Sequence, residues 1–296
     1  MKNLLFVALS LTLFSSSLFG VHKRDPEIGQ KAKSASPAVI DYFEVATTDG
    51  VSSLTKEEFL EIAKTIEKLY RLAIFEKGGV PLVVEADWSD ETVNAFAYRE
   101  ADRWVVQIAG GMARAKFMTK HSLALILCHE LGHHLGGAPR SFLYDGWPSA
   151  EGQADYWATS KCLKKYYKTL GHDDILKDEI PKKAADSCMK VYRNPTDARV
   201  CNLTMRATQH FANFLNGLSN VKYPVSLESS DDRQVKGTNT NDYPRPQCRI
   251  DTLFQGALCS ISSDVATSDY DDKIGHCNDS SSLGARPRCW FRQTKN

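Results

Sequence analysis

The chain has 296 residues, of which 42% are hydrophobic and 25% are charged. This length and hydrophobic content suffice for one sizeable globular domain. Lysine and arginine number 37 against 36 aspartate and glutamate, a formal net charge of +1 that indicates neither a nucleic-acid partner nor an anionic membrane surface.

Residues 1–20 have the pattern of a secretory signal peptide. A short basic start precedes the apolar run Leu4–Phe14, and a serine-rich stretch then ends at Gly20. The apolar run is too short to cross a bilayer, so we expect no integral membrane segment in the mature chain. Export to a periplasm or out of the cell is predicted, with residues 21–50 forming an extended lead-in.

A helix and three strands are predicted next. Thr55 and Glu58 form a capping box that begins a helix ending near Glu76. Its expected apolar face consists of Phe59, Ile62, Ile66, Leu69 and Leu72. Runs rich in β-branched and aromatic residues predict strands at 80–85, 94–99 and 103–108.

The sequence His-Glu-Leu-Gly-His at 129–133 is the most informative stretch of the chain. His129 and His133 stand four residues apart, so in an α-helix both imidazoles lie on one face and can bind one metal ion. Glu130 lies beside the first histidine and is placed to act on a water bound to that metal. The preceding run, 119–128, is apolar enough to bury the helix. This HExxH arrangement is typical of zinc metallopeptidases and predicts one Zn²⁺ per chain.

A catalytic zinc usually has three protein ligands and one open position. Glu151 and Asp155 are again four residues apart, so a second helix would present both carboxylates on one face. We expect Glu151 to be the third ligand and Asp155 to accept a hydrogen bond from the far ring nitrogen of a ligand histidine. Ala154 and Ala158 would let the two helices approach closely. The alternative is that Glu151 only favours the dipole of a first helical turn, with Asp155 in solvent.

The spacing of the ligands indicates the subclass of zinc site. Glu151 follows His133 by 18 positions (151 − 133), which fits a glutamate ligand on a separate helix, the gluzincin arrangement. The metzincin pattern needs a further histidine soon after the first motif, and none stands at that offset. His134 points away from the face of His129 and His133, and we expect it near the helix C-terminus in its charged form.

The second half of the chain predicts two more helices, at about 179–192 and 197–218, and a polar loop at 226–242. Four of the eight cysteines come late, in or next to a polar tail, and we expect them to pair with one another in an undetermined pattern. These four are Cys248, Cys259, Cys277 and Cys289. Cys128 is expected to be a small, buried and unpaired side chain.

The order of elements, a few strands and then mostly helices, predicts an α+β fold. We expect a mostly helical, zincin-like domain over residues 51–260 with a small edge-exposed sheet. A disulfide-tied, disulfide-rich C-terminal tail is expected over 261–296.

Three blocks of the chain resemble the HtpX-like and CAAX prenyl protease-like gluzincin metallopeptidases. The first is Asn94-Ala-Phe-Ala97, followed by a second strand and the HExxH helix, and the second is Glu151-Gly-Gln-Ala-Asp155. The third is Asp242-Tyr-Pro-Arg-Pro-Gln-Cys-Arg-Ile250, which is similar to the family's Thr-His-Pro-x-x-x-x-Arg-Ile. Tyr243 stands where the family usually has histidine. The membrane-spanning helices of the best-known members have no counterpart, so the likeness is to soluble, secreted members.

These patterns predict a zinc-dependent endopeptidase of loose preference that acts on peptides or on exported or misfolded proteins. Zinc would lower the pKa of its bound water toward ~7, and Glu130 would take the proton as general base. The peptide would lie antiparallel to the strand that contains Asn94 to Ala97, held by main-chain hydrogen bonds, a placement that the resemblance also implies. The residues of this expected substrate-binding strand are Asn94, Ala95, Phe96 and Ala97.

Tyr243 and Arg249 are the candidates that would stabilise the negative tetrahedral intermediate, because they fall in the third resembling block. His172 and His210 are further candidates. For Arg249 the alternative is an ion pair inside the disulfide-tied part of the chain.

Two other functions fit part of the pattern. A zinc aminopeptidase would share the site, but it needs an acidic group for the free amino terminus, and the sequence contains no recognisable motif for one. A non-catalytic binding or chaperone-like protein with structural zinc would close all four metal positions with protein ligands, and Glu130 would then have no purpose.

Overall fold

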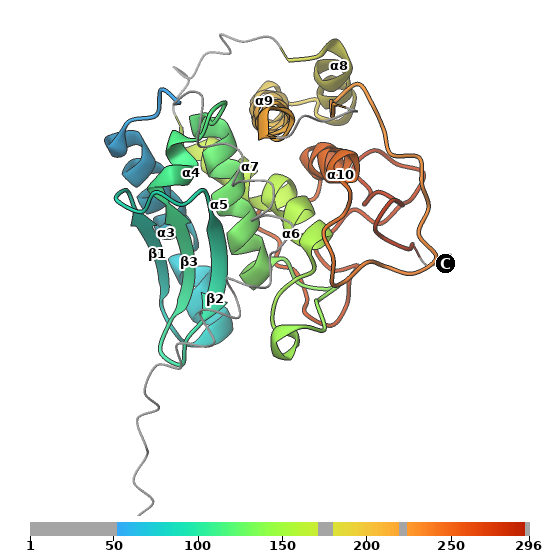
Figure 1. The fold of residues 1–296 in the computed structure, drawn as a ribbon. Helices are drawn as coiled ribbons and strands as arrows, with labels where there is room; N and C mark the ends of the chain where they lie inside the picture. Colours follow the sequence, from blue (N-terminus) through green and yellow to red (C-terminus); the bar gives the residue numbers. More distant parts are fainter. Residues whose placement is uncertain (1–51, 171–179, 219–223, 294–296) are drawn as a thin grey trace, which may run out of the picture.

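The computed structural model describes residues 52–170, 180–218 and 224–293. The predicted signal peptide and lead-in lie outside these residues, as does His172. The described chain is a mostly helical α+β fold with a small mixed sheet, as predicted (Figure 1). The sheet lies at one side, a group of helices occupies the middle, and the irregular C-terminal segment lies on the side away from the sheet.

The sheet consists of β1 (Leu82–Asp87), β2 (Ala95–Arg99) and β3 (Trp104–Ala109), close to the predicted ranges. The strand order is β1-β3-β2, with β3 parallel to β1 and antiparallel to β2. The central strand β3 is the most buried of the three. β2 is therefore an edge strand, as the predicted edge-exposed sheet requires.

Helix α3 (Lys56–Gly78) begins with the predicted capping box, in which Thr55 and Glu58 each accept a hydrogen bond from the other's backbone N–H. It ends at Gly79, whose φ of 69° is left-handed and suits glycine. The buried face consists of Phe59, Ile62, Ala63, Ile66, Tyr70 and Ile74. Leu72 was expected on this face, but it is 63% exposed, because it projects away from the stripe that contains Tyr70 and Ile74.

The helices after the sheet are α4 (Gly110–Arg114), α5 (Lys120–Leu135), α6 (Glu151–Trp157), α7 (Leu163–Thr169), α8 (Lys182–Val191), α9 (Pro195–Leu218) and α10 (Pro246–Leu258). A π-helical turn, η3 (Ala158–Cys162), joins α6 to α7. The two helices predicted in the second half are confirmed as α8 and α9, and 226–242 has no regular secondary structure. Helix α10 was not predicted. Pro246 in its first turn is a usual start, and apolar residues recur through it at helical spacing.

Four disulfides cross-link the described residues, as expected for an oxidising compartment outside the cytoplasm. They are Cys128–Cys162, Cys188–Cys201, Cys248–Cys289 and Cys259–Cys277. The four late cysteines therefore pair with one another, as predicted. The prediction that Cys128 is unpaired was wrong, because η3 brings Cys162 to a Cα–Cα distance of 5.5 Å.

The C-terminal tail packs against α6 through buried aromatic side chains as well as through its disulfides. Trp290 and Phe291 are buried, whereas the sequence analysis expected cross-links to hold this segment in place of apolar residues. A Cβ atom on Gly152 would lie 2.4 Å from the Trp290 ring, so the missing side chain lets the tail approach α6. Tyr156 adds a hydrogen bond of 2.6 Å to the carbonyl oxygen of Gly284.

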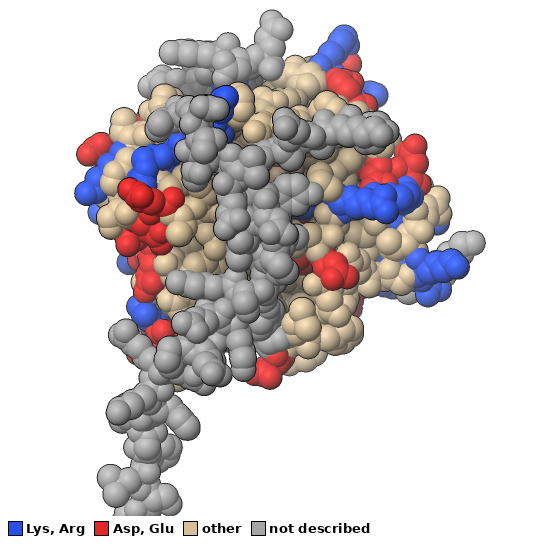
Figure 2. Space-filling model, in the orientation of Figure 1, with Lys and Arg blue, Asp and Glu red and all other residues tan. Residues whose placement is uncertain are grey.

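Charges of both signs are distributed over the surface. On the face shown in Figure 2, lysine and arginine side chains of the described residues alternate with aspartate and glutamate. Across the described ranges, no helix combines the length and the apolar character needed to span a membrane.

Two lysines that follow α6 are buried and bind backbone carbonyl groups of the C-terminal part. Lys161 donates to Ser262 O at 2.7 Å, and Lys164 donates to Cys259 O at 2.5 Å. Lys164 also donates to the Tyr192 hydroxyl at 2.8 Å. Desolvation by burial lowers the pKa of Lys164 to about 7.

We expect Lys164 to make stability depend on pH. Its pKa rises from about 7 in the folded chain to about 10.5 on unfolding, so the cost of burying its charge is full below pH 7 and disappears as the pH approaches 10. The unfolding free energy of the natural protein relative to Lys164→Met should rise over this range, by up to about 1.4 kcal/mol per pH unit. Urea unfolding of both proteins at pH 6.5, 7.5, 8.5 and about 9.5 measures it. A difference that is constant with pH would contradict the expectation.

Candidate metal centre

Helix α5 buries the HExxH sequence. Thr119 caps its N-terminus, and almost every residue from His121 to Leu135 is buried. His129 and His133 lie one turn apart with ring centroids 4.9 Å from each other, so both imidazoles occupy one face of the helix, as their spacing predicts.

Helix α6 brings Glu151 to the two histidines. Glu151 Oε2 lies 3.2 Å from His129 Nε2, and Oε1 lies 3.8 Å from His133 Nε2. The three candidate ligand atoms are within 4.8 Å of one another. The helices can approach this closely because a Cβ atom on Gly132 would lie only 2.9 Å from Ala154 O. The small residue expected at 154 therefore meets a glycine on α5.

The donors fit a divalent metal ion. Two imidazole nitrogens and a carboxylate form a set that binds zinc in many proteins. Glu151 Oε2 is buried, and no hydrogen bond of good geometry reaches it from the described residues, although His129 Nε2 lies 3.2 Å away. A cation that contacts this oxygen would offset the cost of its burial. Burial alone would raise the pKa of Glu151, but the neighbouring His133 and His129 hold it below its usual value.

Asp155 connects the candidate ligands to α10. Its Oδ1 lies 2.8 Å from His129 Nδ1, which is the contact expected from the sequence. Arg249 binds the same carboxylate through Nε and Nη2, both at 2.8 Å. Asp155 is 0% exposed, so the alternative of a solvated Asp155 is wrong. Burial alone would raise the pKa of Asp155, but Arg249 and His129 hold this pKa well below its usual range.

The other histidine is oriented by a backbone carbonyl. His133 Nδ1 lies 2.9 Å from Ser149 O, while Ser149 N donates to His133 O at 3.0 Å. If His133 Nδ1 carries the hydrogen, Nε2 is left with its lone pair toward Glu151, as a metal ligand requires. Ser149 was not predicted as part of the site, because a backbone acceptor carries no residue-type pattern in the sequence.

Glu130 faces a small cavity. The cavity has a volume of about 30 Å³, and its polar lining residues are His129, Glu130, Tyr243 and Arg249. Tyr243 and Arg249 lie close together, with the Arg249 Cζ atom 5.0 Å from the Tyr243 ring. The structure thus brings the two residues proposed for the intermediate to the same cavity as Glu130. Burial raises the pKa of Glu130.

One residue of the predicted substrate strand reaches this cavity. Ala95, the first residue of β2, lines it. Asn94 holds the start of β2, because its side-chain oxygen accepts from Ala95 N at 2.9 Å. Phe96 stacks on Tyr98 at 5.8 Å, and neither Phe96 nor Ala97 lines the cavity.

Two other histidines lie away from the candidate ligands. His134 packs between the rings of Trp104 and Trp147, and its Nε2 lies 3.0 Å from Val105 O. Burial lowers its pKa to about 3, so the prediction of a charged His134 was wrong. His210 lies 2.9 Å from the hydroxyl of Thr119, at the opposite end of α5 from the HExxH sequence.

The tail closes the C-terminal end of α5. The Thr267 hydroxyl donates to Leu135 O at 2.6 Å, and Ala138 N donates to Ser268 O at 2.8 Å. Between these two bonds, Gly137 has a φ of 74°, and a Cβ atom there would lie 2.5 Å from Ser268 O. The tail therefore satisfies backbone groups that the helix end leaves open.

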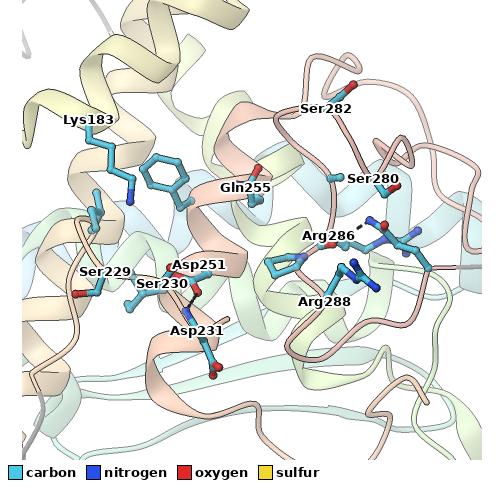
Figure 3. Close-up of a pocket in the computed structure, with 16 residues that line it drawn as sticks. Lys183, Ser229, Ser230, Asp231, Asp251, Gln255, Ser280, Ser282, Arg286 and Arg288 are labelled. Atoms are coloured by element: carbon cyan, nitrogen blue, oxygen red, sulfur yellow. Dashed lines mark hydrogen bonds between the residues drawn. The ribbon is translucent and has the colours of Figure 1, made fainter. Parts of the chain in front are cut away.

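A larger cavity, of about 280 Å³, lies between α8, α10 and the tail (Figure 3). Lys183, Asp251 and Arg288 are among its lining residues, and none of the predicted site residues lines it. A second cluster of possible ligands, Asp231 with Cys248 and Cys289, is unsuitable for a metal because the two cysteines form a disulfide.

Comparison of the chain with protein-family models, with curated proteins and with solved structures finds no match. What the site can do follows from its residues and their geometry. The described residues join three donors suited to a metal, a buried carboxylate beside them, and a carboxylate–guanidinium pair behind them.

We expect Asp155→Asn to bind zinc about 10- to 100-fold more weakly, because the charged partner of His129 is lost while the side-chain size is kept. A competition titration with a chromogenic chelator measures the affinity. Asp251→Asn on α10, outside the candidate centre, is the matched control and should bind zinc as the natural protein does. Equal affinities in all three folded proteins would contradict a role for Asp155 in metal binding.

Proposed function

We propose that this protein is a zinc-dependent endopeptidase of the gluzincin type. The observation that carries the proposal is the position of Glu130, which lines a cavity together with the ligand candidate His129. A structural zinc site, closed by four protein ligands, would have no use for a further carboxylate in a cavity next to one of the ligands. The resemblance of the three sequence blocks to HtpX-like and CAAX prenyl protease-like peptidases agrees with this function.

His129, His133 and Glu151 would hold the zinc ion. Such an ion supplies a Lewis acid that polarises a peptide carbonyl and acidifies a water molecule. Asp155, 2.8 Å from His129 Nδ1, would favour the His129 tautomer with its hydrogen on Nδ1, which leaves Nε2 free to bind the metal, and the Ser149 carbonyl would do the same for His133.

Glu130 is the proposed general base. It would accept a proton from the attacking water and later give it to the leaving amine. Because the cavity walls around it are largely apolar and buried, little bulk water competes for this carboxylate.

Tyr243 and Arg249 have different proposed roles. Arg249 binds Asp155 through two of its nitrogens, which supports the ion-pair alternative and a positioning role. Tyr243 lines the cavity beside Glu130, and its hydroxyl is the better candidate to donate to the negative oxygen of the intermediate.

The substrate is proposed to be a peptide in extended conformation. β2 is an edge strand whose first residue, Ala95, lines the cavity of Glu130. A peptide that pairs with β2 would make main-chain hydrogen bonds and pass the ligand candidates. This binding is independent of most side chains, which suits an endopeptidase.

The test compares the natural protein with Glu130→Gln for zinc content and for casein cleavage. We expect one zinc per chain in both, and a loss of cleavage of about 10²- to 10⁴-fold in the variant, because proton transfer is lost while the ligands remain. Glu91→Gln, at an exposed glutamate, is the matched control and should keep full activity.

The other outcomes separate the alternatives. Zinc in both proteins without cleavage of casein would favour a binding protein. Cleavage of free but not of acetylated peptides would favour an aminopeptidase. Absence of zinc from the natural protein would contradict the proposal of a zinc-dependent peptidase.

A further inference from the structure

The cavity beside Glu130 has apolar walls contributed by several elements. Its apolar lining residues are Ala95 of β2, Met112 of α4, Leu125 and Ile126 of α5, and Phe211 of α9. The polar residues His129, Glu130, Tyr243 and Arg249 complete the lining. A group that enters this cavity therefore has the proposed base and the other polar residues beside it, and apolar side chains form the rest of its surroundings.

The cavity is small. Its volume of about 30 Å³ is far below the roughly 300–1,000 Å³ of ordinary ligand pockets. Ala95, Met112, Leu125 and Phe211 are all less than 10% exposed, so their side chains are packed on their outer sides as well. A packed wall of this kind yields little to a larger group.

Phe211 is fixed from several directions. Its ring lies 6.3 Å from the ring of Phe214 and 5.4 Å from the Arg249 guanidinium carbon. Helix α9 packs against α5 and α10 and is cross-linked to α8 by Cys188–Cys201. Phe211 is therefore a fixed part of the cavity wall, contributed by α9.

We propose that this cavity receives the side chain of one of the two substrate residues that flank the cleaved bond, and that it restricts this residue to a small apolar one. The inference rests on the proposed peptidase function and specifies its substrate. Alanine or valine side chains fit the available space. Leucine and phenylalanine are larger than this space, and a charged side chain would lose its hydration against the apolar walls, where Arg249 is already paired with Asp155.

The position of the cavity indicates that the side chain entering it belongs to a residue next to the cleaved bond. Glu130 would act on the water that attacks the cleaved carbonyl, so a side chain that contacts Glu130 belongs to a residue at that bond. In an extended peptide paired with β2, alternate side chains project to the same face. Only one of the two flanking residues can therefore enter the cavity, and Phe211 and Ala95 determine its size.

The experiment uses acetylated peptides that differ at one flanking position at a time, with glycine, alanine, valine, leucine, phenylalanine or aspartate there. At one of the two positions the natural protein should prefer alanine or valine over leucine and phenylalanine by about 10-fold or more in kcat/KM. Phe211→Ala enlarges the cavity and should reverse this order. Ala95→Val keeps a residue that suits a strand but narrows the cavity. At the selective position it should lower kcat/KM for the valine peptide more than for the alanine peptide.

Leu215→Ala, on the same helix but outside the cavity lining, is the matched control and should keep the natural order. Binding gives a second readout that needs no turnover. The Glu130→Gln variant should bind the same peptides in the same order of affinity in a calorimetric titration. If Phe211→Ala does not fold, Ala95→Val and the order of peptide affinities still test the size restriction.

Cleavage of casein together with equal cleavage of all peptides would overturn the size restriction and leave the peptidase function intact. The same holds if folded Phe211→Ala keeps the natural order, or if Leu215→Ala shifts it equally. A zinc-loaded natural protein that cleaves neither casein nor any peptide would overturn both proposals.

Discussion

The close approach of α5 and α6 is the constraint on which the candidate centre depends. Gly132 meets the backbone of Ala154 at a separation that leaves no room for a Cβ atom, so the two helix axes lie unusually close. The candidate ligands project from these two helices, and their donor atoms converge because the backbones do. The Cys128–Cys162 disulfide joins α5 to the turn that continues α6, and thereby limits the separation of the helices near His129.

A buried chain of charges extends this arrangement to α10. Asp155 is placed between His129 and Arg249, with all three side chains largely out of solvent. Removing one partner of such a buried pair costs about 3–5 kcal/mol, because the other charge remains without compensation. Helix α10 is in turn bound to the tail by Cys248–Cys289, so the position of Asp155 depends on elements far away in sequence.

The sequence predicted the parts of this arrangement that have local patterns. The spacing of His129 and His133 follows the helical repeat, and the capping box of α3 is a local pattern at a helix start. Both are present in the structure. The close approach at Gly132, the carbonyl of Ser149 behind His133, and the partner of Cys128 arise only when segments meet in space, so no local pattern reveals them. The prediction that His134 is charged was wrong for a related reason. Position near a helix end favours a cation, but burial between two tryptophans outweighs that effect.

The contacts of the tail with Leu135 and Gly152 affect the order in which the molecule can be completed. Translation delivers α5 and α6 well before Thr267 and Trp290, yet the end of one helix is hydrogen-bonded, and the start of the other is covered, by those later residues. A nascent chain that contains every candidate ligand therefore still lacks the residues that close the end of α5 and cover the start of α6. These contacts can form only after the C-terminal segment has been synthesised.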